Sequence, residues 1–90
     1  MMRRTSVVEV LRFLGLEGST LLADLRSEGL FEDEWLDAER AEELRVAASL
    51  IGELGVNPAG VDVALHMRRR MLALEARTQH SLERLLQELE

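Results

Sequence analysis

Several residue types are scarce or missing, and each absence narrows the classes of protein that this sequence can encode. None of the 90 residues is cysteine, so a disulfide framework and a cysteine metal site are both excluded. Tyrosine is also absent. The chain has only one proline and three aromatic residues, and this low content favours helices over an all-β fold. No apolar run approaches the ~20 residues of a membrane span, and no apolar segment follows Arg3 and Arg4, so no signal peptide is predicted. We expect one small, cytoplasmic, all-α domain.

The net charge of −6 is concentrated in the middle third of the chain. Residues 28–57 contain nine acidic residues and two arginines, whereas residues 1–27 and 58–90 are close to neutral. This balance argues against nucleic acid as a partner, because affinity for phosphate normally comes from positive charge. Two compatible interpretations stay open: a solvated helix start with its entry loop, or a docking face for a basic partner.

Four helices are predicted from capping residues and from apolar residues at spacings of three and four. They are expected over about residues 6–14, 19–28 and 38–54, and from residue 58 to residue 90. The first begins at a capping box formed by Ser6 and Glu9. Asp37 is the expected N-cap of the third helix, and Asn57 caps the fourth, with Pro58 at its first position.

The first two helices have the outline of a helix-turn-helix, with Gly15 in the turn and Gly29 after the second helix. The segment from residue 30 to residue 36 is too short for two full strands. We expect an irregular or extended link there, without a hairpin of its own. Its apolar residues are predicted to be buried: Leu30, Phe31, Trp35 and Leu36.

The predicted fourth helix divides the chain into two parts within one domain. Residues 1–57 would form the helix-turn-helix-like part with its acidic link and third helix, and residues 58–90 the long C-terminal helix. A helix of ~30 residues is ~45 Å long, which exceeds the diameter of a 90-residue globule. Its second half must therefore project, fold back on the core or pack on another chain.

The apolar residues of this helix predict which face meets which partner. Those in its first turns are expected to face the first and third helices: Val61, Ala64, Leu65, Met67 and Met71. Further apolar positions recur at steps of 3, 4, 4, 3 and 4, as in a coiled-coil seam with one stutter. These residues predict a homodimer: Met71, Leu74, Thr78, Leu82, Leu85 and Leu89.

Residues that usually carry catalysis are sparse. His66 and His80 lie 14 residues apart on one helix, about 21 Å, too far to share a metal ion within one chain. No serine stands in a triad-like local pattern, and no glycine-rich phosphate loop is present. Residues 68–70 are three arginines that spread over ~200° of the helix surface, so ion pairs with the acidic middle third are expected ahead of phosphate binding. We expect a non-enzymatic protein with no metal and no cofactor.

Three stretches of sequence together suggest a family. The first runs from Leu14-Gly15-Leu16 through Leu22, Leu25, Gly29 and Leu30, and the second is Trp35-Leu36-Asp37 before a helix with Arg40, Ala41 and Leu44. The third and most specific is Leu54-Gly55-Val56-Asn57-Pro58-Ala59-Gly60-Val61-Asp62-Val63-Ala64-Leu65. The layout resembles the MerR-type helix-turn-helix superfamily and, within it, the chaperone modulators of the CbpM-like family. The resemblance implies a MerR-like fold. It also implies binding to the J-domain of a DnaJ- or CbpA-type co-chaperone, and this binding would regulate the work of the co-chaperone with a DnaK-type chaperone.

Two departures separate the chain from the DNA-binding members of that superfamily. Ala23 and Asp24 follow Leu22, where the DNA readers carry arginine and tyrosine. The short acidic segment 32–34 stands where those proteins have a basic wing, and phosphate would repel it. A J-domain presents a basic helix to its partner. The negative charge of the middle third of this chain is complementary to the positive charge of such a helix.

The predicted partner-binding residues therefore lie in and around the link: Glu28, Phe31, Glu32, Asp33, Glu34, Trp35, Asp37 and Glu39. Phe31 and Trp35 would be the apolar anchors, because aromatic residues dominate interface energetics, unless both pack in the core instead. Two further hypotheses stay open. A regulator of the MerR or heat-shock-repressor type would bind DNA through a phosphate-binding face: Arg3, Arg4, Arg12 and Arg26. The chain could also be a dimerisation module for an unrelated partner.

Overall fold

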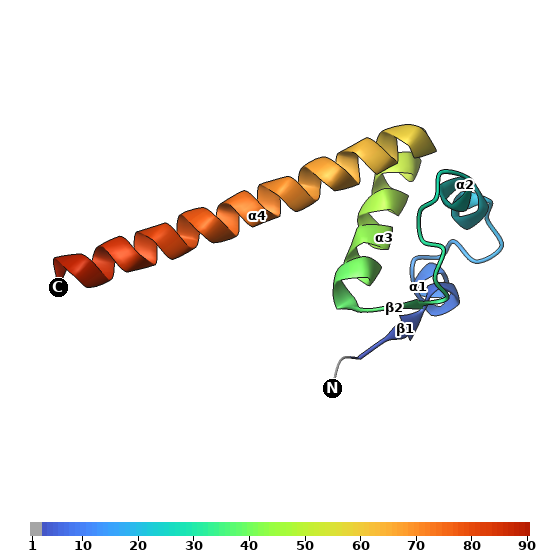
Figure 1. Cartoon of the computed structure of the whole chain (residues 1–90). Coiled ribbons are helices and arrows are strands. Elements are labelled where there is room, and N and C mark those ends of the chain that lie inside the picture. The colour runs from blue at the N-terminus through green and yellow to red at the C-terminus, as the bar shows by residue number, and fades with distance from the viewer. Residues whose placement is uncertain (1–2) are drawn as a thin grey trace.

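The computed structural model describes residues 3–90, and most of them are helical, as the sequence predicts (Figure 1). The elements in chain order are β1 (Thr5–Ser6), α1 (Val7–Phe13), α2 (Leu21–Ser27), β2 (Trp35–Leu36), α3 (Ala38–Gly52) and α4 (Pro58–Leu89). The elements up to α3 gather into a small body, from which α4 projects as a straight rod (Figure 1). We call residues 3–57 the head and residues 71–90 the arm.

Three of the predicted helix caps are confirmed. The side chains of Ser6, Asp37 and Asn57 each accept the amide hydrogen of the residue three positions later, at 3.0, 2.8 and 2.7 Å. Each hydrogen bond satisfies an amide that has no partner within its helix. The capping box is only half formed, because the carboxylate of Glu9 pairs with Arg12 at 2.7 Å.

All four predicted helices are present, and two of their ends lie two residues from the approximate bounds expected from the sequence. α2 begins at Leu21 and not at residue 19, and the hydroxyl of Thr20 donates a hydrogen bond to Asp24 at 3.2 Å. α3 ends at Gly52, and Leu54 lies beyond it with 71% of its surface exposed. The chain then turns at Gly55, whose φ of +67° is a conformation that glycine adopts without steric cost.

The extended part of the link pairs with the N-terminal end of the described chain. β1 and β2 are antiparallel, with Thr5 opposite Leu36 and Ser6 opposite Trp35. The link holds no hairpin of its own, as expected, but it pairs with β1, a strand that no pattern in the sequence indicates. Neighbouring residues of a strand point to opposite faces, so Leu36 is 2% exposed while Trp35 is 60% exposed. The prediction that Trp35 is buried is therefore wrong.

One apolar core joins the head to the first turns of α4. Its members come from every helix and from the link: Val7, Leu11, Leu21, Leu25, Leu30, Phe31, Leu36, Leu44, Ala47, Val61 and Leu65. From α4, Val61 and Leu65 pack into this core, and both are 0% exposed. The prediction that Met67 and Met71 also face the core is wrong, because both are 59% exposed.

The arm extends away from the head. Every residue from 71 to 90 is exposed, and the principal extents of the molecule are 56 × 31 × 21 Å. Of the three outcomes expected for the second half of the long helix, the single chain shows projection. None of the helices in residues 3–90 combines the length and the apolar character that crossing a membrane requires.

Candidate partner-binding surface

Trp35 lies between two shallow hollows on the head. A hollow of about 340 Å³ is lined by Asp33, Glu34, Asp37 and residues of the N-terminal segment and α3, including Arg4. A smaller one of about 230 Å³ lies between β1, α1 and α2 and includes Arg26. The indole ring borders both. We call the set Asp33, Glu34, Trp35 and Asp37 the Trp35 surface.

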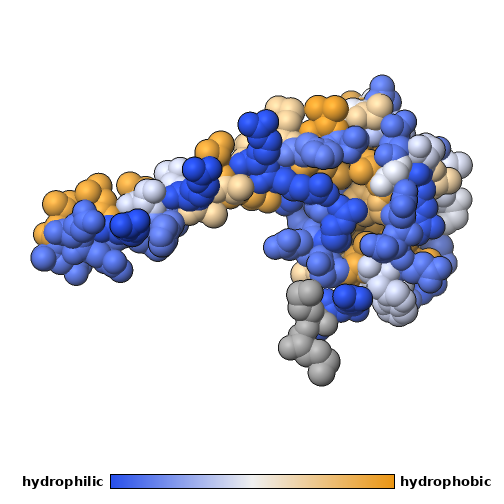
Figure 2. All heavy atoms as spheres, in the orientation of Figure 1, coloured by the Kyte–Doolittle hydropathy of each residue, from blue (hydrophilic) through white to orange (hydrophobic). Residues whose placement is uncertain are grey.

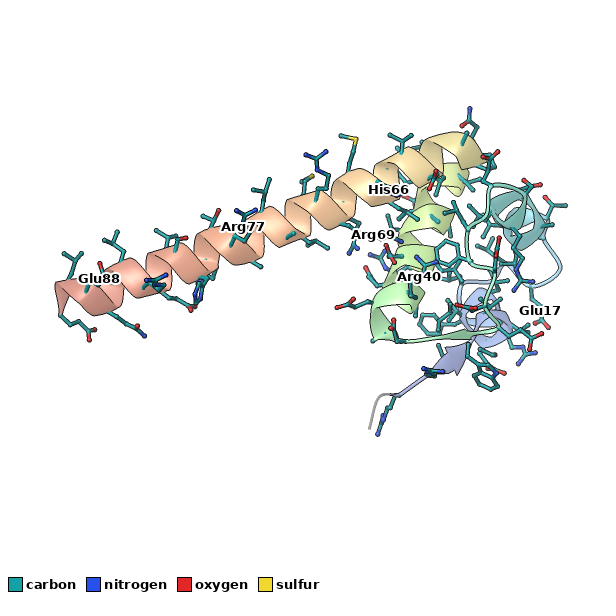
Figure 3. All side chains as sticks on the ribbon, in the orientation of Figure 1. Glu17, Arg40, His66, Arg69, Arg77 and Glu88 are labelled. Atoms are coloured by element: carbon teal, nitrogen blue, oxygen red, sulfur yellow. The ribbon has the colours of Figure 1, made fainter. Side chains whose placement is uncertain are left out.

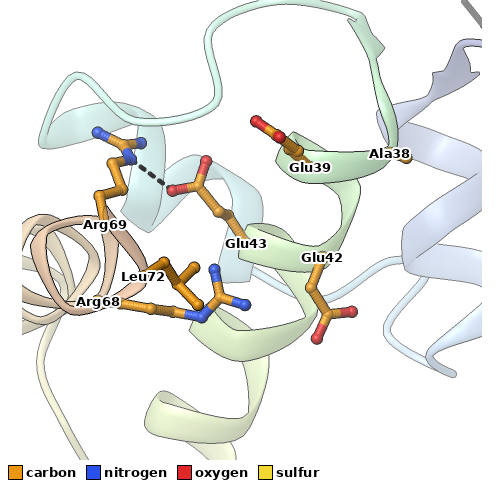
Figure 4. A pocket seen from close by; sticks show the side chains of 7 residues that line it. All are labelled: Ala38, Glu39, Glu42, Glu43, Arg68, Arg69 and Leu72. Carbon is orange, nitrogen blue, oxygen red and sulfur yellow. Dashed lines mark hydrogen bonds and ion pairs between the residues drawn. The ribbon is translucent and has the colours of Figure 1, made fainter. Parts of the chain in front are cut away.

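The predicted docking residues do not all belong to this surface. Glu32 and Glu28 are exposed in the segment that leads from α2 towards it. Glu39 lines a different hollow, between α3 and α4, together with Arg68 and Arg69 (Figure 4). Asp37 is half-buried, because its carboxylate is engaged as the N-cap of α3. The structure thus brings together four of the eight predicted residues and leaves three exposed nearby or on another side.

Phe31, the eighth residue, is part of the core. Its side chain is 1% exposed, so the prediction of Phe31 as an anchor for a partner is wrong. Its backbone has a φ of +55°, which is unfavourable for a residue with a side chain. Two arginines hold this conformation: Nε of Arg26 donates to the Phe31 carbonyl oxygen at 2.8 Å, and the guanidinium of Arg40 lies 4.5 Å from the ring centroid.

Glu43 is a buried acidic residue that connects α3 to α4. Its carboxylate accepts hydrogen bonds from Nη1 of Arg40 at 2.8 Å and from Nε of Arg69 at 2.6 Å. Figure 4 shows the bond to Arg69, and Figure 3 labels both arginines, one on α3 and one on α4. Burial by itself raises the pKa of Glu43, but the two hydrogen bonds and the charges of both arginines lower it below its ordinary value. The predicted ion pairing between residues 68–70 and the acidic middle third is confirmed for Arg69. The burial of Glu43 was not predicted, because no local pattern distinguishes it from its exposed neighbours.

The four arginines of the DNA-binding hypothesis do not share one face that is free of acidic partners. Arg12 pairs with Glu9 at 2.7 Å and with Glu17 at 3.1 Å. Arg26 is half-buried and donates to the backbone of the link. Arg3 and Arg4 are exposed, and Arg4 borders the Trp35 surface.

The outer face of α2 has the wrong charge for a DNA-reading helix. Its exposed positions are Ala23, Asp24 and Ser27, and Glu28 follows at the end of the helix. Two carboxylates on this face would meet the phosphates of a duplex with like charge. Arg26, the basic residue of this helix, is turned towards the link.

The predicted dimer residues all lie on the arm, and all are exposed in the single chain. The structure adds Val63 and Met67 to the same edge of α4, each 59% exposed. The sequence predicts a core-facing position for Met67 and no role for Val63, because spacing alone does not locate the point at which α4 leaves the head. Apolar side chains are visible along one edge of α4 as far as its end (Figure 2).

Comparisons of the chain with protein-family models, with curated proteins and with solved structures found no match.

Proposed function

We propose that this protein is a non-enzymatic adaptor that binds the J-domain of a DnaJ- or CbpA-type co-chaperone and regulates its work with a DnaK-type chaperone. The observation that carries the proposal is Trp35, a tryptophan 60% exposed and flanked by carboxylates. The sequence resemblance to the CbpM-like family supplies the identity of the partner. The charge and shape of the Trp35 surface supply the mode of binding.

An exposed tryptophan in this setting fits the centre of an interface. Tryptophan buries a large area, loses little side-chain entropy and is enriched among the residues that dominate binding energy. Asp33 and Glu34 are exposed beside it, and Glu32 precedes them. Acidic residues around an apolar centre would steer a basic helix into place and raise the rate of association. Arg4 and Arg26 at the edges of the surface would pair with acidic residues of the partner.

The DNA-binding alternative has weaker support. It rests on Arg3, Arg4, Arg12 and Arg26, of which Arg12 and Arg26 already have partners within the chain. A duplex would also have to approach an α2 face that carries Asp24 and Glu28. A regulator built in this way would need to break its own ion pairs before it could neutralise phosphate.

Calorimetric titration with a DnaJ-type J-domain at low and high salt tests the proposal. We expect binding that weakens as salt rises, because exposed charges are screened. Trp35→Ala and the triple reversal Glu32→Lys, Asp33→Lys and Glu34→Lys should each weaken it at least tenfold. A matched triple reversal on other exposed acidic residues, at Glu53, Glu83 and Glu90, should leave the affinity nearly unchanged at moderate salt.

The possible outcomes separate the hypotheses. If a folded J-domain gives no heat at either salt concentration, the proposal is wrong. If both triple reversals weaken binding equally, net charge and not the Trp35 surface controls the interaction. Replacement of Arg3 and Arg12 by alanine should leave J-domain binding in place, since neither residue borders the Trp35 surface, and a loss of duplex affinity in that variant would favour the DNA-binding alternative.

A further inference from the structure

A series of side-chain contacts connects α4 to the Trp35 surface. Nε of Arg69, on α4, donates to one carboxylate oxygen of Glu43 at 2.6 Å, and Nη1 of Arg40 donates to the other at 2.8 Å. The guanidinium of Arg40 also lies 4.5 Å from the centre of the Phe31 ring, and Arg40 lines the larger hollow beside Trp35. Arg40 therefore contacts both the carboxylate that holds α4 and the surface proposed for partner binding.

The bond between Arg69 and Glu43 is the long-range member of this series. Its partners are 26 residues apart, whereas every other side-chain hydrogen bond within residues 3–90 spans five residues at most. Any displacement of α4 away from α3 therefore breaks this bond. An open hollow of about 500 Å³ lies beside Arg69, so its guanidinium has space to move away from the carboxylate (Figure 4).

We propose that Arg40 is a positioning residue that couples the position of α4 to the charge of the Trp35 surface. The side chain of Glu43 is 6% exposed, with one arginine on each carboxylate oxygen. When Arg69 withdraws, one oxygen of this buried charge loses its partner, which is costly. Arg40 replaces the lost bond by turning two N–H groups of its guanidinium towards the carboxylate. The same turn takes its charge away from the Phe31 ring and from the hollow beside Trp35.

The turn of Arg40 makes the Trp35 surface more acidic. In the structure, Arg40 lines the larger hollow together with three carboxylates of that surface and offsets part of their charge. The pairing of β1 with β2 holds the backbone of the link, as does the hydrogen bond from the Val7 amide to the Glu34 carbonyl at 2.9 Å. The coupling therefore changes the charge beside Trp35 while the backbone of that residue stays in place.

The consequence for J-domain binding rests on the proposed function of the Trp35 surface. A basic helix binds more tightly when positive charge leaves the surface on which it docks. Removal of one unit charge at about 4 Å in water changes an affinity by about fivefold. Release of Arg69 from Glu43 therefore tightens J-domain binding by about this factor. In this way α4 regulates the Trp35 surface, although it does not line it.

Fluorescence quenching tests the coupling without a partner, because Trp35 is the one tryptophan of the chain and tyrosine is absent. Iodide is an anionic quencher and responds to positive charge near the indole, whereas neutral acrylamide responds to exposure alone. Arg69→Ala should lower the ratio of iodide to acrylamide quenching, because Arg40 leaves the hollow. The matched control, Arg70→Ala, removes the same charge from the next, exposed position of α4 and should keep the wild-type ratio.

Two further variants separate coupling from a general loss of structure. Arg69→Lys restores a cation opposite Glu43 and should return the quenching ratio towards the wild-type value. Glu43→Gln combined with Arg69→Ala removes the charge that attracts Arg40, so this double variant should also return towards the wild type. A purely structural defect would instead grow in the double variant. Helical content from circular dichroism verifies that each variant is folded.

Calorimetric titration with the J-domain completes the test. We expect Arg69→Ala to bind about fivefold more tightly than Arg70→Ala. Equal quenching ratios in these two variants would overturn the coupling. A lower ratio in Arg69→Ala with equal J-domain affinities would overturn the regulation of binding. If the wild type binds no J-domain and the ratio still falls in Arg69→Ala, the proposed function is wrong and the coupling is supported.

Discussion

Leucine has opposite environments in the two parts of the molecule. In the head, Leu25 and Leu44 are 0% exposed and packed among residues from several elements. In the arm, Leu74 and Leu82 are 59% and 51% exposed. The spacing of these residues along their helices is the same, at steps of three and four. Helical periodicity therefore specifies that a face is apolar, but it does not specify which surface covers that face.

This contrast assigns different sources of stability to the two parts. The core residues of the head pack against one another and against the first turns of α4 in the same chain, so we expect the folding of the head not to depend on concentration. A solitary amphipathic helix derives most of its stability from packing and little from intrinsic propensity. The arm has no such packing within its own chain, and the predictions below separate the two contributions.

The largest effect is expected for a core leucine. Leu44→Ala removes a fully buried side chain and should lower the free energy of unfolding by about 2–5 kcal/mol at every protein concentration. If the homodimer predicted from the sequence forms, the same substitution at Leu82 should have an effect that depends on concentration, because Leu82 lies in the predicted dimer contact and not in the core. Thermal unfolding followed by circular dichroism at several concentrations measures both. Equal and concentration-independent losses would show that the arm is not an intermolecular element.

The next effect concerns the carboxylate that connects the head to α4. Glu43→Gln keeps the shape of the side chain but removes the charge that Arg40 and Arg69 share. We expect a loss of about 1–2 kcal/mol, since charged hydrogen bonds contribute more than neutral ones and the two arginines are partly exposed. The matched control is Glu42→Gln on the next residue, which pairs with Arg45 on the surface and should give no measurable change in denaturant unfolding. Equal losses in the two variants would contradict a special role for the buried carboxylate.

The same carboxylate predicts how stability depends on pH. The pKa of Glu43 is lower in the folded protein than its ordinary value of 4.5, so the unfolded chain binds its proton more readily. Its contribution is therefore complete above about pH 4.5 and is lost as the pH falls through the folded pKa. Denaturant unfolding from pH 7 to pH 3 should show this loss in the wild type and a smaller loss in Glu43→Gln. Identical profiles would mean that other carboxylates control acid unfolding.

Local features of the fold could be predicted from the sequence because their physics is local. The caps at Ser6, Asp37 and Asn57 each involve a side chain and an amide three residues later. The pairing of β1 with β2 joins segments that are 30 residues apart, and two-residue strands leave no alternation to detect. Trp35 was assigned to the wrong side for this reason, since its orientation depends on that pairing.

The candidate surface was predicted only in part, because the exposure of its aromatic residues depends on contacts between segments that are distant in the sequence. The acidic character of the link follows from composition, and Asp33 and Glu34 are exposed as such residues usually are. Phe31 and Trp35 are both aromatic, yet Phe31, with a φ of +55°, lies in the core beneath Arg40, whereas the β1–β2 pairing turns Trp35 to the surface. Which of the two aromatic side chains is exposed depends on the conformation of the backbone, and the spacing of residues in the sequence does not define that conformation.

The smallest effect is expected for the N-cap of α4, and it tests whether α4 and the head unfold as one cooperative unit. Asn57 caps α4 at the point where the helix leaves the head, and its side chain satisfies the amide of Gly60 at 2.7 Å. Asn57→Ala should lower the free energy of unfolding by about 1 kcal/mol, while Asn57→Asp, which also caps well, should stay near the wild type. Because Val61 and Leu65 of the same helix belong to the core, the loss should appear in the cooperative unfolding of the head. Hydrogen exchange distinguishes the alternative: if the cap affects only the arm, protection would fall beyond residue 70 and remain unchanged in α3.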